Sequence, residues 1–418
     1  MEKDLTKQLI LEYQEIALNK QLFVRPFNIE DNLNYVFVGL RRAGKSFLMF
    51  QQIQKMIKNG HSKDEILYFN FEDDRLGVLN ISDLEQIKLC YEELFDSKPI
   101  FFLDEIQIVQ GWEKFARRLA DTGYRVFITG SNAKMLSKEI ATTLGGRFMI
   151  TEVFPLSFKE FLHFNNIDLS NKNAKHKYRN EIIKFSEKYF YFGGLPEVVN
   201  IADKREWISN LYQKIFYGDL IARHQIRNDF ALKILIKKLA ENIKQPSSYN
   251  RIANIVSASG KKITTDTVID YMEYLKESLL IFAIENISAK FQERESNRKY
   301  YFIDNGLLNL FLIDPNTFLL ENIVAIQLLK KYKKELYFYN KNIEVDFYIP
   351  DEKLAIQVSY SMSDLDTRKR EVDALDKLSG KFDLENMSII TKDEEETIIT
   401  NSGKTIEVIP LWKWLFAL

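Results

Sequence analysis

The chain has 418 residues, of which 58 are Lys or Arg and 59 are Asp or Glu, so its formal charge is −1. At about 100–200 residues a domain, this length predicts two to four domains. A hydrophobic content of 46% excludes a largely disordered chain, and no apolar run approaches the ~20 residues that span a bilayer. The single cysteine excludes an internal disulfide and an all-Cys zinc site, and the four histidines show no metal-ligand spacing. We therefore expect a cytoplasmic protein without a membrane segment, whose balanced charge gives no general case for nucleic-acid binding.

The first 155 residues are predicted to form one α/β domain. Residues 4–18 repeat apolar side chains at helical spacing and predict an amphipathic helix. Short apolar runs then alternate with helical stretches, at 35–39, 66–71, 99–105, 125–131 and 147–153. Continuous apolar strands separated by helices are typical of a parallel sheet that is covered on both faces.

The remaining chain is predicted to contain three further parts. Residues 156–245 are mostly helical, with a Gly-Gly-Leu-Pro break at 193–196. Residues 246–312 predict a winged helix, because two helices and a turn precede strands at 279–287 and 298–304. Residues 313–418 predict a small α/β domain, with helices at 317–331 and 364–379 and strands near 336–340, 343–349, 353–359, 387–391 and 404–409.

A phosphate-binding loop is predicted between the first strand and the next helix. Residues 39–46 read Gly-Leu-Arg-Arg-Ala-Gly-Lys-Ser, a complete G-x-x-x-x-G-K-[ST] motif, and Phe47 continues into the helix. The glycines permit a tight turn that aims backbone N–H groups at phosphate oxygens, while Lys45 can reach the β- and γ-phosphates. The Ser46 hydroxyl can ligate Mg²⁺. The predicted loop residues are Gly39, Arg41, Arg42, Ala43, Gly44, Lys45, Ser46 and Phe47, with no chemistry assigned to the two arginine side chains.

Polar residues at three later positions are candidates for the same site. The strand at 99–105 ends in Asp104 and Glu105, which predicts a carboxylate in the metal shell and a glutamate that polarises the attacking water. The next strand ends in small polar residues, and there Ser131 and Asn132 could bond the γ-phosphate or that water. Arg147, after two glycines, could stabilise transition-state charge, either in its own chain or across a subunit interface of a homo-oligomer.

Together these residues resemble a prokaryotic family of AAA-type ATPases that carry a C-terminal domain of unknown function. The resemblance runs from about residue 30 to about residue 395 and also rests on PLSFKEFL (155–162), YFGGLPEVV (191–199), TVIDYMEYL (267–275), YYFIDNGLLN (300–309) and IEVDFYI (343–349). It implies ATP binding at Gly44, Lys45 and Ser46, with Asp104 and Glu105 as the acidic pair.

The C-terminal region resembles a restriction-endonuclease-like fold. Such a site needs an acidic residue before one strand and Glu-x-Lys on the next. Glu344 and Asp346 supply the first part, and Glu321 could add a carboxylate, but the next strand carries Gln357 and Ser359 in place of the glutamate and the lysine. We therefore predict that this domain does not cleave nucleic acid.

The sequence thus predicts an ATPase that uses ATP and Mg²⁺ and acts as a nucleotide-gated switch toward a protein partner. Two alternatives stay open, a non-hydrolysing ATP-binding interaction protein and a DNA-binding ATPase. The recognition-like helix at 265–280 counts against DNA because its charge is mostly negative and phosphate would repel it. It carries one lysine, Lys276, and four acidic residues, Asp266, Asp270, Glu273 and Glu277. Positive charge that could contact DNA lies instead in the turn and the wing, at Lys261, Lys262, Lys290, Arg294, Arg298 and Lys299.

Overall fold

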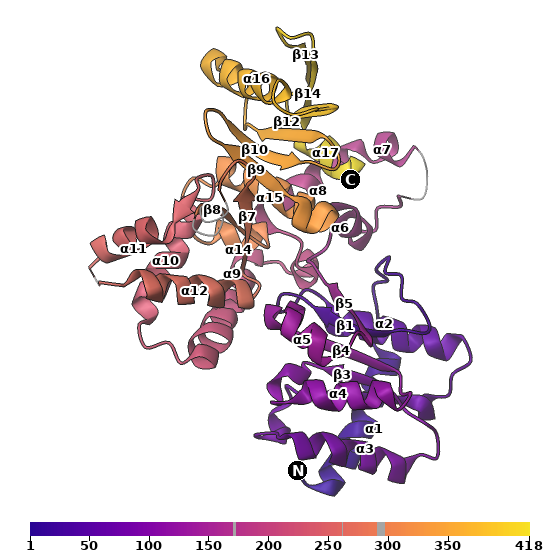
Figure 1. The fold of residues 1–418 in the computed structure, drawn as a ribbon. Helices are drawn as coiled ribbons and strands as arrows, with labels where there is room; N and C mark the ends of the chain where they lie inside the picture. The colour runs from indigo at the N-terminus through magenta and orange to yellow at the C-terminus, as the bar shows by residue number, and fades with distance from the viewer. Residues whose placement is uncertain (170–172, 261, 291–296) are drawn as a thin grey trace. The chain divides into compact units, whose positions relative to one another are not determined.

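The computed structural model describes residues 1–169, 173–260, 262–290 and 297–418 (Figure 1). The chain divides into two compact units, Met1–Phe154 and Pro155–Leu418. In the described residues no helix is both long and apolar enough to cross a membrane. The predictions for Lys261 and Arg294 fall outside the described residues.

The first unit is a five-stranded parallel sheet with helices around it (Figure 1). Its strand order is β2-β3-β4-β1-β5. The strands are β1 (Asn34–Val38), β2 (Ile66–Asn70), β3 (Ile100–Asp104), β4 (Val126–Gly130) and β5 (Phe148–Glu152). The main helices are α1 (Lys3–Asn19), α2 (Lys45–Lys58), α3 (Ile81–Leu94), α4 (Trp112–Asp121) and α5 (Lys138–Thr143). This confirms the predicted parallel sheet.

Strands β1 to β4 are buried on both faces, which is why they read as continuous hydrophobic runs. Every residue of β3 and β4 is buried. The rings of Phe102 and Phe127 stack with their centroids 4.6 Å apart, and α1, α2 and α4 pack on the strands. Because all the pairings in this sheet are parallel, the carboxyl ends of the strands meet at one edge of the sheet.

The second unit begins with helices and continues into a larger sheet. The helices before that sheet are α6 (Phe158–Phe164), α7 (Ala174–Lys177), α8 (Arg179–Phe192), α9 (Lys204–Lys214), the π-helix η6 (Ile215–Ala222), α10 (Asp229–Glu241), α11 (Tyr249–Ala258) and α12 (Thr265–Glu277). Later helices are α14 (Asn305–Asn309), α15 (Asn316–Tyr332), α16 (Leu365–Ser379) and α17 (Leu411–Ala417).

Nine strands of the second unit form one mixed sheet. They are β6 (Ser247–Ser248), β7 (Ile281–Asn286), β8 (Asn297–Phe302), β9 (Tyr337–Asn340), β10 (Glu344–Ile349), β11 (Leu354–Val358), β12 (Asn386–Thr391), β13 (Glu396–Ile399) and β14 (Thr405–Pro410), in the order β13-β14-β12-β11-β10-β9-β7-β8-β6. Strand β7 pairs in parallel with β9, so the sheet runs across the boundary predicted at residue 312. Helix α16 packs on β10 and β11 over a core that includes Val345, Leu375 and Ile389.

Candidate nucleotide site

The loop between β1 and α2 has the tight geometry that its glycines predict. A Cβ at Gly39 would lie 2.2 Å from the carbonyl oxygen of Val153, so only glycine fits there. Gly44 has a φ of +99°, in the left-handed region, and caps the N-terminus of α2. The first residues of α2 therefore present their backbone N–H groups at the loop, as phosphate binding requires.

Lys45 is buried beneath the loop, with only 4% of the residue exposed. Its Nζ donates to the carbonyl oxygens of Gly39, at 3.1 Å, and Leu40, at 3.3 Å. The same Nζ lies 3.1 Å from Glu105 Oε1. A buried ammonium is stable only when it is paired and hydrogen-bonded, and these three oxygens meet that need.

Glu105 is held by donors on both of its carboxylate oxygens. While Oε1 faces Lys45, Oε2 accepts from Gln107 Nε2 at 2.6 Å and from the backbone N–H of Ser131 at 3.1 Å. Glu105 has a φ of +57°, in the left-handed region, where the chain leaves β3. Burial opposes the charge, but Lys45 and the Gln107 amide outweigh it and lower the pKa of Glu105 to about 2. Glu105 is therefore an ionised carboxylate in a water-poor site.

Asp104 lies beside Glu105 and is bound by two hydroxyl groups. Tyr68 donates to its Oδ2 at 2.6 Å and Thr129 donates to its Oδ1, while the Ser46 hydroxyl lies close enough to lower the pKa of the carboxyl group. Burial and the neighbouring charge of Glu105 raise the pKa of Asp104, while these hydroxyls lower it. The predicted metal residues, Ser46 and Asp104, are thus brought together, and their oxygen atoms are of the kind that Mg²⁺ binds.

The order of the strands explains why these residues meet. Strand β4 lies between β3 and β1, and all three end at the same edge of the sheet. The loop after β1, the acidic pair at the end of β3 and Ser131 after β4 therefore converge there. Crevices at the carboxyl ends of parallel strands are the usual ligand sites of α/β sheets.

The other predicted loop residues differ in their exposure. Arg41 makes a two-pronged ion pair with Glu72, at 2.8 and 3.0 Å. Arg42 is exposed and has a φ of +66°, and Phe47 is 41% exposed. Ala43 is buried, and its carbonyl oxygen accepts from Arg25 Nη1 at 3.1 Å. Glu72, at the turn after β2, thus orients an arginine of the loop.

Asn132 and Arg147 are not part of the cluster of Lys45, Asp104 and Glu105. The side-chain oxygen of Asn132 accepts from the backbone N–H of Lys134 at 2.8 Å and so caps the turn that follows β4. Arg147 precedes β5, at the end where β5 pairs with the start of β1. The loop follows the other end of β1, which at ~3.3 Å a residue lies about 15 Å away. Arg147 thus stands at the opposite edge of the sheet from the loop of its own chain.

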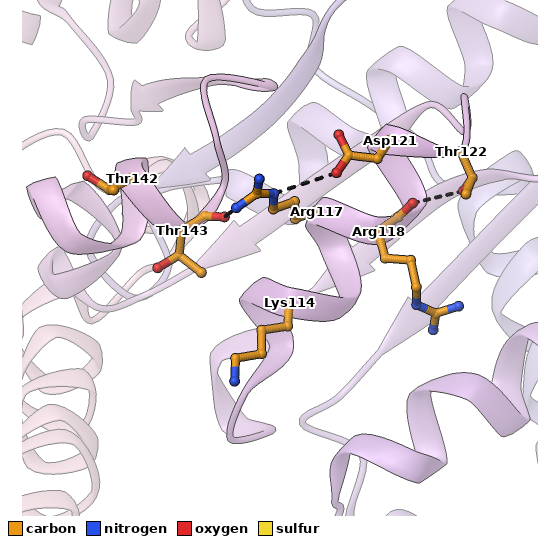
Figure 2. A pocket seen from close by; sticks show the side chains of 7 residues that line it. All are labelled: Lys114, Arg117, Arg118, Asp121, Thr122, Thr142 and Thr143. Carbon is orange, nitrogen blue, oxygen red and sulfur yellow. Dashed lines mark hydrogen bonds and ion pairs between the residues drawn. The ribbon is translucent and has the colours of Figure 1, made fainter.

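Arg147 instead belongs to a surface between α4 and α5. Its Nε lies 2.9 Å from Asp121 Oδ1, and its side chain is 56% exposed. Asp121 also lines the pocket of Figure 2, in which Arg117 forms an ion pair with Asp121 and donates to the backbone carbonyl oxygen of Thr143. Lys114, Arg118, Thr122 and Thr142 complete the lining.

Three side chains in the site were not identified from the sequence. They are Tyr68, Thr129 and Gln107, which hold Asp104 and Glu105 in place. Gln107 lies two residues after Glu105, and this closeness in sequence could have indicated that it contacts the glutamate. Tyr68 and Thr129 lie on strands β2 and β4, so only the neighbouring strand order could have indicated them.

Comparison with known proteins agrees with this geometry. A protein of Methanocaldococcus jannaschii described as uncharacterized is 37% identical to this chain, over 99% of it and 95% of that protein. An uncharacterized protein of Haemophilus influenzae is 32% identical, over 91% of this chain and 93% of that protein. The chain belongs to the same family as these two proteins. In this member of the family, residues 31–162 match the model of an AAA domain and residues 184–317 that of a domain of unknown function, DUF8612. The N-terminal unit is therefore a P-loop domain of the AAA ATPase type.

Solved structures with some likeness to this family member are more distant. The Walker-type ATPase paby2304 of Pyrococcus abyssi is 13% identical, with a TM-score of 0.43 over 74% of this chain and 95% of that chain. The ORC1 protein of Aeropyrum pernix, solved in complex with DNA, is also 13% identical, with a TM-score of 0.29 over 75% of this chain and 92% of that chain. Both TM-scores are below 0.5, so neither likeness bears on function.

Proposed function

We propose that this protein binds ATP together with Mg²⁺, hydrolyses ATP, and uses the bound nucleotide as a switch toward a protein partner. The observation that carries the proposal is the buried contact between Lys45 and Glu105, beside Asp104 and Ser46, at the carboxyl edge of the sheet. This contact joins Lys45, the proposed phosphate ligand, to Glu105, the member of the acidic pair to which we assign no metal. A protein that only held a nucleotide would not need that glutamate.

The geometry supports a defined order of events. In the structure, Lys45 Nζ is bound to Glu105 and to two carbonyl oxygens of the loop. The phosphates of ATP offer Lys45 stronger anionic partners, so its ammonium would move to them and Glu105 Oε1 would become available. That oxygen would then accept a hydrogen bond from the attacking water and a proton from it. Glu105 would be released for this role only when ATP is present.

Ser46 and Asp104 would hold Mg²⁺ at the phosphates. The metal would neutralise charge on the β- and γ-phosphate oxygens. The Tyr68 and Thr129 hydroxyls would keep the Asp104 carboxylate oriented toward Ser46, since each donates to one of its two oxygens. Arg147 would contribute only across an interface between copies of the chain, because it lies at the far edge of the sheet from the loop.

Steady-state ATP turnover of the wild type, Lys45→Ala and Glu105→Gln tests this function. Lys45→Ala should lose ATP binding, while Glu105→Gln should retain binding and lose turnover by at least about a hundredfold, as expected for a general base. Lys58→Ala, at the exposed end of the same helix, is the matched control and should leave both unchanged. Wild-type turnover no greater than that of Glu105→Gln would favour the non-hydrolysing interaction protein instead.

The second unit weakens the DNA-binding alternative at two of the predicted contacts, while Lys262 and Lys290 are exposed. Of the basic residues that the sequence offered for a phosphate contact, Arg298 lies 3.0 Å from Glu285 and Lys299 is fully buried. The expectation that Lys299 presents its charge in the wing is therefore wrong, because acidic side chains surround it. Adding duplex DNA to the turnover assay tests the alternative, and stimulation that falls steeply with salt would revive it.

A further inference from the structure

The second unit contains a fully buried lysine among three carboxylates. Lys299 lies on β8 and has no exposed surface. Its Nζ is 3.0 Å from Asp346 Oδ1, 3.2 Å from Glu344 Oε1 and 3.3 Å from Glu321 Oε1. Glu344 and Asp346 come from β10, and Glu321 comes from α15. One ammonium thus joins three elements that are distant in the sequence.

These carboxylates are the ones that the nuclease-like pattern of the sequence offered for a metal. Two of these carboxylates have further partners: Tyr301 also donates its hydroxyl to Glu321 Oε1 at 2.8 Å, and the Val358 N–H donates to Asp346 Oδ2 at 3.0 Å. Burial raises the pKa of Glu321, and the charge of Lys299 opposes that rise. The acidic groups are therefore arranged around the lysine, which supplies the positive charge at their centre.

Gln357 shows why a neutral amide stands where a nuclease would have a carboxylate. Its Oε1 accepts from the Asp346 N–H at 2.8 Å, while its Nε2 donates to Glu371 Oε2 at 2.7 Å and to the Glu344 carbonyl at 3.0 Å. A glutamate at this position could not donate, so its second oxygen would face two other oxygens. The amide completes the network that a carboxylate would break.

We propose that Lys299 is a built-in cation that takes the place of a divalent metal ion in this nuclease-like centre. The centre then clamps β8 and α15 to β10 and admits no metal. Mg²⁺ holds its oxygen ligands at about 2.0–2.1 Å and Ca²⁺ at about 2.3–2.6 Å, so neither can share the carboxylates with an ammonium at their centre. On this proposal, the loss of Glu-x-Lys from β11 and the burial of Lys299 belong together. The chain lacks residues that a metal-dependent nuclease needs, and an ammonium occupies the place of the metal.

Mn²⁺ binding to the full chain without nucleotide, followed by the electron spin resonance of free Mn²⁺, tests the proposal. Lys299→Met should gain one Mn²⁺ site at least tenfold tighter than any site of the wild type, and adding Asp346→Asn should remove it. Lys353→Met is the matched control, because this half-exposed lysine also lies between two carboxylates, 2.7 Å from Asp383 and 2.6 Å from Glu385. A folded Lys299→Met protein that gains no site would overturn the proposal.

A second arm does not depend on the folding of Lys299→Met. The Glu344 side chain is half exposed, so Glu344→Gln should fold. It should leave Mn²⁺ binding of the protein within twofold of the wild type, because the centre holds no metal while Lys299 is present. A Mn²⁺ site of the wild type that Glu344→Gln removes, or DNA cleavage with Mn²⁺ that it removes, would overturn the proposal. Either result is independent of the ATPase function, since the P-loop is intact in both proteins.

Discussion

Glu105 is bound by a lysine on one carboxylate oxygen and by two amide donors on the other. We expect ATP to displace the lysine and to leave the amide donors bound. Under the proposed function Lys45 would turn to the phosphates, whereas Gln107 and the Ser131 N–H, which both donate to Oε2, would stay in place. Once Lys45 moves, these two donors alone would fix the glutamate. Gln107 is therefore a positioning residue for the proposed base, although it does not itself contact the reacting atoms.

We expect Gln107→Leu to lower kcat for ATP about tenfold to hundredfold, less than loss of the base itself, with KM nearly unchanged. The physical reason is that Glu105 would keep a single fixed donor and rotate away from the water. Steady-state kinetics check this expectation, with the exposed Gln110→Leu on the same loop as the control. A variant with unchanged kcat, or with a raised KM alone, would show that Gln107 has no part in orienting the glutamate.

At the scale of elements, a buried carboxylate ties two loops of the second unit together. Asp304 accepts from the N–H groups of Gly306, at 2.8 Å, and Leu307, at 3.3 Å, and so caps α14. Its other oxygen accepts from the Gly194 N–H at 2.8 Å. GGLP and FIDNG are parts of two motifs that carry the resemblance. They contact each other through the hydrogen bond between Gly194 and Asp304.

Gly193→Ala should destabilise the second unit by about 2–4 kcal/mol, because two costs coincide. Gly193 has a φ of +74°, and a Cβ there would lie 2.1 Å from Asp304 Oδ1. Urea unfolding monitored by circular dichroism measures the change. Gly218→Ala is the control, since nothing lies within 4 Å of a Cβ at this π-helix position, and it should be neutral or slightly stabilising. Equal effects of the two substitutions would contradict this account.

The same elements show what the sequence could and could not predict. Strands β1 to β4 were predictable because burial on both faces makes each an apolar run. The loop was predictable because the tight turn itself requires its glycines. Strand β13 was missed, since it alternates half-buried and exposed residues at the edge of its sheet. The environments of Lys299 and Arg147 were also missed, because each depends on a strand register that no local pattern records.

At the scale of the molecule, each of the two units has its own apolar core. Phe102 and Phe127 stack in the first, and Val345, Leu375 and Ile389 pack in the second. A nucleotide that binds only to the native P-loop stabilises the unit that contains it, by about 2.7 kcal/mol at a hundred times its Kd. Lys299 and Asp304 act within the other unit. We therefore expect nucleotide to change the stability of the first unit, and substitutions near Lys299 or Asp304 to change the stability of the second.

We expect differential scanning calorimetry of the full chain to resolve two transitions. ATP with Mg²⁺ should raise the midpoint of one transition by about 5–10 °C, since 1 kcal/mol corresponds to about 2–4 °C for a unit of this size. Lys45→Ala should abolish this shift, and Lys58→Ala should preserve it. Gly193→Ala should lower the midpoint of the other transition and leave the ATP-dependent shift intact. A single transition that responds to both nucleotide and Gly193→Ala would show that the two cores unfold as one, and that nucleotide binding reaches the second unit through shared stability.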